Sequence, residues 1–248
     1  MTDLEKNETV LSQENQTAEL QENQINTEEW PAGESKSYEP IEKINPWLTI
    51  WLKPRKTIRY IVQTNPTQYV IILSMISGFF TSLDRASSKN MGDDFPLWGI
   101  LLIALFLGTL GGIISLYICS ALIRWTGSWM NGQANTEQIR AAMAWSYLPT
   151  IYGSILWIPE LAIYRKELFT RYTPIMDSST FLSTMLLVFN AIEVTCAIWS
   201  MIVFYKCLGE VQGFSAWKAL GNCIIAFLVV FVPIIVFVMI ATSLLSSF

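Results

Sequence analysis

The stretch INPWLTIWLKPRKTIRYIVQ, from Ile44 to Gln63, stands directly before the first long apolar block of the chain. Apolar side chains recur in it at helical spacing, and a group of cations falls largely on the other helical faces. Such a helix lies in the interface of an anionic membrane leaflet, with its cations toward the headgroups. We therefore expect an amphipathic interfacial helix over residues 44–64. The side chains expected to anchor it at the membrane surface are Trp47, Trp51, Lys53, Arg55, Lys56 and Arg59.

Five later blocks are long and apolar enough to cross a bilayer core of about 30 Å, which takes around 20 helical residues. With lipid around them, helices satisfy these backbones internally. The sequence therefore predicts an all-α polytopic membrane protein, a five-helix transmembrane bundle preceded by the interfacial helix. The expected spans cover residues 66–83, 96–123, 141–163, 181–204 and 222–245.

The N-terminal segment has a different composition. Residues 1–42 hold eleven acidic residues against two lysines, a balance of −9, whereas residues 43–248 carry a balance of +5. An acidic, Gln/Asn-rich segment without a periodic apolar face cannot offset the entropy lost on ordering. We expect residues 1–43 to be a disordered acidic cytoplasmic tail and residues 44–248 to be the membrane domain. No cleavable signal peptide is expected, because the first thirty residues contain no apolar core.

Basic residues near the span ends predict the orientation. The side of the interfacial helix carries Lys53, Arg55, Lys56, Arg59, Arg124, Arg140, Lys206 and Lys218. The opposite side carries Arg85, Lys89, Arg165, Lys166 and Arg171. This bias places the N-terminus in the cytoplasm and the C-terminus outside, in the cell (plasma) membrane. The cluster from Arg165 to Arg171 opposes it and would fit a re-entrant third segment.

Glu193 is the most unusual residue of the predicted spans. A central acid costs about 2.5–3.5 kcal/mol, which the apolar residues of the same span, at about −0.3 to −0.6 kcal/mol each, outweigh. Asn190 lies three residues earlier on the same helical face, so both side chains should point into the bundle. Two interpretations stay open. One is a proton or cation site or a partner contact; the other is a protonated acid hydrogen-bonded to a neighbouring span. Glu160 is expected near a membrane boundary.

Gly108 and Gly112 belong to a stripe of small residues along the second span, with Ala104 and Ser115. Small residues four apart let two helix backbones approach closely. We expect this stripe to serve helix packing within the chain. The alternative is contact with a transmembrane helix of another protein.

The residue inventory argues against an enzyme. The chain has no histidine, the commonest general base and metal ligand. Its four cysteines lack the spacing of a disulfide framework or a zinc site. No phosphate-binding glycine loop, catalytic triad or pair of metal-binding carboxylates can be assembled. We expect no catalytic residue, no cofactor, no metal and no nucleic-acid partner.

Three sequence elements stand around the predicted spans. They are NPWxxIWxxPR at Asn45–Arg55, GxxxxxxxRAAxAWxxxP at Gly132–Pro149 and LGEVQGFSxxKA at Leu208–Ala219. As an ordered set they resemble the Yip-domain family, the Ypt/Rab-interacting membrane proteins, and more closely its bacterial branch. The matching residues in the two later, cytoplasmic elements are Gly132, Arg140, Pro149, Gly209, Glu210, Gly213 and Lys218.

The resemblance implies a role without catalysis. Bacterial relatives of the YknW type resemble accessory proteins of ABC exporters that protect cells from toxic peptides. It therefore implies an accessory or assembly factor of a membrane transport complex. Its partners would be the lipid bilayer and other integral membrane proteins, namely the ATPase, permease or adaptor subunits of an ABC transporter, with a homo-oligomer as a further option. The alternative is a small ion- or proton-coupled transporter or channel that uses Asn190 and Glu193, and an intramembrane enzyme is a distant third.

Overall fold

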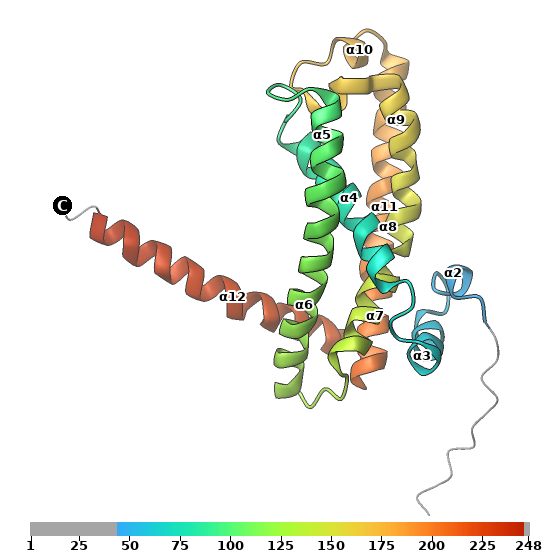
Figure 1. Ribbon diagram of the computed structural model, residues 1–248, viewed down its shortest axis with the longest axis vertical. Coiled ribbons are helices and arrows are strands. Elements are labelled where there is room, and N and C mark those ends of the chain that lie inside the picture. The colour runs from blue at the N-terminus through green and yellow to red at the C-terminus, as the bar shows by residue number, and fades with distance from the viewer. Residues whose placement is uncertain (1–43, 246–248) are drawn as a thin grey trace, which may run out of the picture. The chain divides into compact units, whose positions relative to one another are not determined.

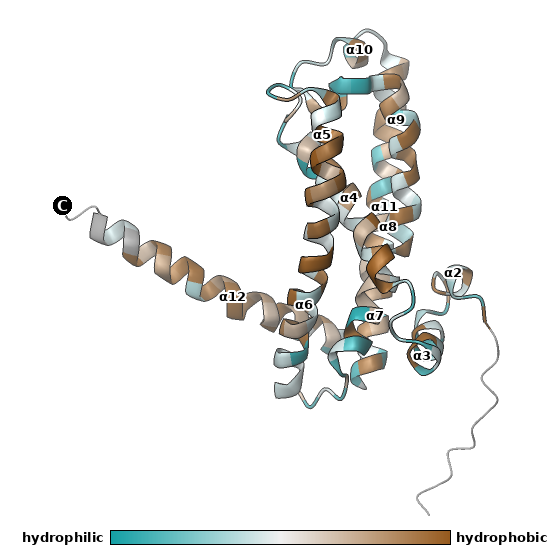
Figure 2. Cartoon of the chain, viewed as in Figure 1, coloured by the Kyte–Doolittle hydropathy of each residue, from teal (hydrophilic) through white to brown (hydrophobic). Residues whose placement is uncertain are grey.

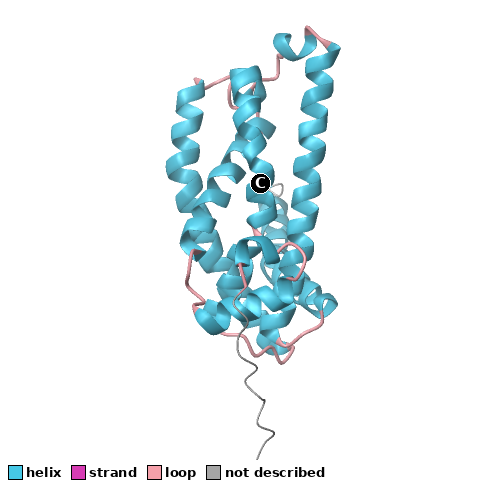
Figure 3. Cartoon of the chain, turned by 90° about the vertical axis from the view of Figure 1, so that its right-hand side faces the viewer, coloured by secondary structure: helices cyan, strands magenta, loops and turns pink. Residues whose placement is uncertain are grey.

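The computed structural model describes residues 44–245, and every regular element in that range is a helix (Figure 3). This confirms the all-α class. The described residues belong to one compact unit that begins at Ile44. The tail predicted over residues 1–43 lies outside the described residues.

Four helical stretches are long and apolar enough to cross a membrane. The second of them is continuous through a π-helical turn, η1 (Figure 1). α4 packs along η1 and α6, and α12 starts beside α6 and α11. These stretches are α4 (Val70–Ser88), α5 (Leu97–Ile103) with η1 (Ala104–Gly108) and α6 (Thr109–Trp129), α11 (Thr180–Gln212) and α12 (Ala216–Leu245).

The third predicted span, residues 141–163, is not one helix. The chain passes along α11 as a series of short helices, from the end of the bundle near α3 to the end near α10 (Figure 1). Proline explains much of the interruption, because it lacks the N–H that a helix interior needs. The pieces are α7 (Thr136–Ser146), α8 (Leu148–Gly153), the 3₁₀ turn η2 (Ser154–Leu156) and α9 (Trp157–Tyr164). The structure thus has four long spans and one broken helical path where five continuous spans were expected.

The breaks in this path lie at polar and proline positions. Pro149 stands in the first turn of α8 and Pro159 in the first turn of α9, where a missing N–H is tolerated. At the junction of α7 and α8, the Ser200 hydroxyl of α11 donates a hydrogen bond to the Ser146 carbonyl. The side chain of a neighbouring helix thus binds a carbonyl at the break.

The interfacial stretch also differs in detail from the expectation. It forms two helices, α2 (Pro46–Thr49) and α3 (Pro54–Thr64), each with proline in its first turn. Asn45 caps α2 by accepting a hydrogen bond from the Trp47 amide, as expected of an Asn-Pro start. Asn65 instead accepts from Thr67 and forms a turn, and α4 begins only after Tyr69, which has a φ of 59°.

Two of the predicted spans end too early. α4 continues past the predicted end at residue 83 to Ser88, and α11 continues to Gln212, where Gly213 ends it with a φ of 72°. This left-handed conformation suits glycine. The loop between α9 and α11 contains the 3₁₀ turn η3 (Arg165–Phe169) and the short helix α10 (Pro174–Asp177).

Buried apolar side chains form two clusters, one toward each end of the bundle. The larger joins Ile50, α3, α7 and parts of α4, α6, α11 and α12 around Trp145 and Ile58. The smaller joins α4, α5, α9 and η3 around Trp157 and Phe169. Between and around them the long helices carry exposed apolar side chains (Figure 2). Such continuous exposed apolar surface fits a lipid environment, and the coarse prediction of a membrane protein is confirmed.

Three glycines hold α4 and the second span in close contact. A Cβ added to Gly112 would come within 2.3 Å of the Ser74 carbonyl oxygen, and one added to Gly78 within 2.3 Å of the Gly108 carbonyl oxygen. Gly108 and Gly112 therefore lie at a backbone-to-backbone contact inside the chain. Gly111, one residue away, has no atom within 4 Å of such a Cβ.

This difference gives a matched test of the packing. Gly112→Ala should destabilise the protein by about 1–3 kcal/mol, because the added methyl overpacks a backbone contact that cannot yield cheaply. Gly111→Ala should leave stability unchanged or slightly improved, since alanine favours a helix. Thermal unfolding of both variants in detergent measures the effect. Equal melting temperatures for the two variants would contradict the close contact of α4 and α6.

Candidate functional site

The three sequence elements lie at one end of the bundle, and Asn190 and Glu193 line a cavity toward the other (Figure 1). One end, here named the motif end, comprises α2, α3, the loop before α7, α7 itself and the junction of α11 with α12. The other end contains a polar cavity between α4, α9, η3, α10 and α11.

Aromatic rings join the first two sequence elements at the motif end. The Trp47 ring of α2 contacts Trp145 of α7, with ring centroids 5.3 Å apart and an edge-to-face geometry. Tyr69 completes the group at 5.5 Å from Trp47. Trp145 itself is almost fully buried. Edge-to-face aromatic pairs contribute about 0.5–1.5 kcal/mol beyond their buried area, so this cluster fixes α2 onto α7.

The apolar face of α3 packs against protein. Ile58 and Ile61 are buried and α3 contacts α11 and α7, whereas Lys53, Arg55, Lys56 and Arg59 are exposed. The prediction that this face lies down on the lipid is therefore corrected. α11, which continues beyond the predicted span, provides the surface that covers it.

Two polar contacts tie α3 to the last turns of α11, where the third sequence element begins. Arg59 forms an ion pair with Glu210 near the end of α11. The Cys207 thiol donates to the Pro54 carbonyl at 3.7 Å. Trp51 adds a further link, since its carbonyl accepts a hydrogen bond from the Trp199 indole at 3.2 Å. The first element and the helix that follows it are thus fixed to α11.

Close backbone approach joins the second and third elements. A Cβ on Gly132 would come within 2.1 Å of the Gln212 side chain and 2.9 Å of the Gly127 carbonyl oxygen, so a larger residue there would displace these groups. The Gln133 amide donates to the Gln212 carbonyl at 3.3 Å. Beyond Gly213, the Lys218 ammonium lies 4.3 Å from the centroid of the Phe214 ring, in cation–π geometry.

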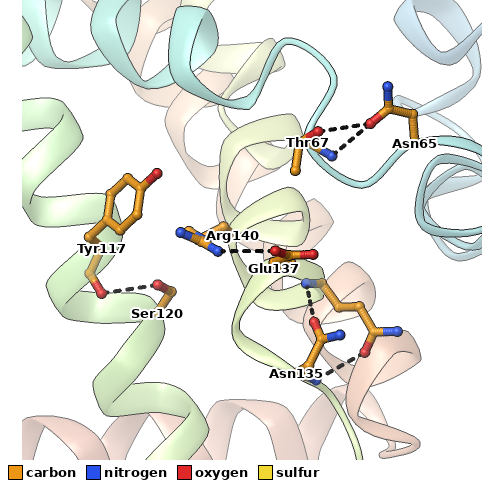
Figure 4. A network of polar contacts seen from close by, with 8 residues as sticks. Asn65, Thr67, Tyr117, Ser120, Asn135, Glu137 and Arg140 are labelled. Carbon is orange, nitrogen blue, oxygen red and sulfur yellow. Dashed lines mark hydrogen bonds and ion pairs between the residues drawn. The ribbon is translucent and has the colours of Figure 1, made fainter.

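Arg140 is positioned over the second span. Its guanidinium carbon lies 4.5 Å from the centroid of the Tyr117 ring, and an Arg140 nitrogen lies 3.9 Å from Glu137 (Figure 4). Asn135 starts α7 with a capping box, in which its side chain and that of Gln138 exchange hydrogen bonds with each other's backbone. Arg140 therefore orients α7 against α6.

A buried amide closes the motif end. Asn222 of α12 is fully buried, accepts from the Thr126 hydroxyl at 2.7 Å and donates to the Ile123 carbonyl at 3.1 Å. These two hydrogen bonds fix the position of the start of α12 along α6. The sequence analysis did not single out Asn222. The signal was present, since it is the polar residue at the start of an otherwise apolar span.

The cavity at the other end has a volume of about 410 Å³. Carboxylates come to it from three helices and one 3₁₀ turn, and apolar and hydroxyl side chains complete its wall. The lining residues are Asp84, Ser87, Ser88, Asn90, Trp157, Glu160, Glu167, Leu168, Thr170, Thr173, Met176, Leu186, Asn190 and Glu193.

The structure brings Asn190 and Glu193 together with the third segment. Both line the cavity with Glu160 of α9. Glu160 is only 3% exposed, so it is buried in the protein, and its expected position near a membrane boundary stays a prediction. Asn190 is exposed, and its amide donates to the Leu186 carbonyl at 2.8 Å. Gly153 allows α8 to lie close to α11, because a Cβ at this position would lie only 3.0 Å from the Cys196 side chain.

Three cavity residues were missed by sequence reasoning. Asp84 lies beyond the predicted end of the first span, and the continuation of α4 carries it to the cavity. Trp157 is buried and stacks on Phe169. Glu167 accepts hydrogen bonds from the Ile175 and Met176 amides, at 2.8–3.1 Å, and so caps α10. The apolar periodicity across Leu83 and Ala86 would have signalled the longer α4.

Long apolar helices around two buried clusters define a multi-pass α-helical membrane protein. The model of the Yip1 domain matches residues 48–238, which is most of the chain, so the protein belongs to the Yip1 domain family. The family resemblance of the three sequence elements is thereby confirmed. Neither the comparison with curated proteins nor that with solved structures gave a match.

The aromatic cluster of the motif end yields a prediction. Trp47→Ala should release α2 from α7, because it removes the ring that contacts both Trp145 and Tyr69. Leu48→Ala is the control in the same helix, since Leu48 is 68% exposed. Hydrogen exchange of residues 46–53 should rise in the Trp47 variant alone. A rise of equal size in both variants would show that the cluster does not hold α2.

Proposed function

We propose that this protein is a non-enzymatic accessory or assembly factor of a membrane transport complex. The favoured complex is an ABC exporter that protects the cell against a toxic or antimicrobial peptide. In this proposal the protein lies in the plasma membrane with its N-terminus in the cytoplasm and its C-terminus outside. Membership of the Yip1 domain family supports a membrane role, and the exporter rests on the resemblance of the three sequence elements to bacterial relatives.

The observation that carries the proposal is the apolar surface of α12. In the most apolar part of this helix, only 6% of the residues are buried within the chain. Its first part packs on α6 and α11 through Ala219 and Ala226, whereas side chains from Phe227 to Ile240 are largely exposed. The helix then leaves the bundle (Figure 1). In this proposal a transmembrane helix of a permease subunit packs on part of this surface, and lipid covers the rest.

The motif end offers a second surface of different character. The cations of α3 are exposed at this end. The helices beneath them are held together by the aromatic cluster, the Arg59–Glu210 pair and the Gly132–Gln212 contact. A fixed cationic surface favours an acidic partner surface or anionic headgroups. In the proposed orientation it faces the cytoplasm, where the ATPase subunits of an exporter lie.

The alternative drawn from the sequence was a small transporter or channel that uses Asn190 and Glu193. Membership of the Yip1 domain family does not favour it.

A site-specific photo-crosslinker on α12 tests the proposal. Placed at Phe237, which is 72% exposed, it should form a product with an exporter permease subunit that co-purifies with its ATPase. Placed at Ala226, which is 4% exposed, it should not. The measurement is mass spectrometry of the crosslinked bands from native membranes. Crosslinks to lipid or to this chain alone would contradict an accessory role on an exporter.

A further inference from the structure

The acidic cavity contains a buried carboxylate oxygen without a partner. Glu160 is 3% exposed, and its Oε1 makes no hydrogen bond. Glu193 Oε1, in the same cavity wall, also lacks a partner. A buried polar atom without a hydrogen bond costs about 1–3 kcal/mol, and more for a charged group. Two carboxylate oxygens without hydrogen bonds in the wall of one cavity suit a bound ligand that interacts with these carboxylates.

The charge around the cavity is of one sign. Asp84, Glu160 and Glu193 come from three different helices, and none of the residues that line the cavity is basic. Neither ion pair seen among the described residues, Arg59–Glu210 or Arg140–Glu137, involves a cavity carboxylate. Like charges in one cavity repel, and an occupant with positive charge would relieve this repulsion.

The arrangement of the acids does not suit a metal ion. Within residues 44–245, no three His, Cys, Asp or Glu side chains stand close enough together to hold one. A metal ion needs ligands that converge to about 2–2.6 Å. Carboxylates spread around about 410 Å³ instead suit a larger cation that contacts them at different points.

Apart from the carboxylates, the wall combines hydroxyl and amide side chains with apolar and aromatic ones. Trp157 lines the cavity, and its ring is held by stacking on Phe169 at 5.7 Å between centroids. Leu186 and Met176 add apolar surface. An indole that lines such a cavity offers apolar surface to the ring system of an organic cation. The volume is within the range of about 300–1,000 Å³ typical of small-molecule sites.

We infer that this cavity is a binding site for a small amphiphilic organic cation, with Glu160 and Glu193 as the groups that bind its charge and Trp157 as the ring that contacts its apolar part. Glu167 does not serve this role, because its carboxylate caps α10. The site lies at the end of the bundle opposite the motif end. It requires no second protein, so its test is independent of the exporter proposal.

Ethidium serves as the probe, with the purified full-length protein in nanodiscs of zwitterionic lipid. Fluorescence anisotropy should show saturable binding above that of empty nanodiscs. Glu160→Gln should weaken the binding at least tenfold, because it removes the buried charge. Glu193→Gln should weaken it as well, and it changes a less buried side chain, so it serves as a second test if Glu160→Gln does not fold.

The matched control is Asp94→Asn, an exposed acid in the loop after α4 that does not line the cavity. Its affinity for ethidium should equal that of the wild type. Phenanthridine, a neutral ring system of similar shape, should not compete. Absence of saturable binding to the wild type, or equal affinity in the wild type and in a folded Glu160 or Glu193 variant, would overturn the inference.

Discussion

The hydrogen bond from the Ser200 hydroxyl to the Ser146 carbonyl marks the constraint on which this fold depends. In lipid no water satisfies a backbone group that a helix break releases, so protein must do it. The segment from α7 to α9 is broken at two places. It is packed along α11 at α7 and α8, and Ser200 supplies the side chain at the first break. α11 therefore acts as the support on which a discontinuous segment can pass through the bundle.

The breaks in this segment affect the packing at both ends of the bundle. Its first part, α7, carries Trp145 and Arg140 and meets α2, α3 and α6 at the motif end. Its last part, α9, carries Trp157 and Glu160 to the cavity. In a single straight helix of the same length, the helical period would fix the directions in which the side chains of both halves point. The breaks allow each half to present its residues to different neighbours, and the two buried clusters reflect this division.

Much of this architecture is readable from local sequence chemistry. The Asn45-Pro46 start, the Asn135 cap and the Gly108/Gly112 stripe follow from rules that involve a few neighbouring residues. The broken third segment is less readable, since Pro149 and Pro159 indicate interruption but do not show which helix covers it. The buried face of α3 was assigned to lipid, because apolar spacing alone cannot distinguish a lipid surface from a protein surface. Glu160 and Asp84 reach the cavity only through tertiary contacts between helices that are distant in sequence.

The central claim is that the broken segment carries the chain from one end of the bundle to the other. Single cysteines at Gln133 and Tyr172, both exposed, test it in a variant whose four native cysteines are replaced. A membrane-impermeant maleimide is applied to intact cells and to inside-out vesicles. The account predicts that the Cys at position 133 is labelled only in inside-out vesicles and the Cys at position 172 only in intact cells. Labelling of both positions from the same side would contradict it and would make the third segment re-entrant.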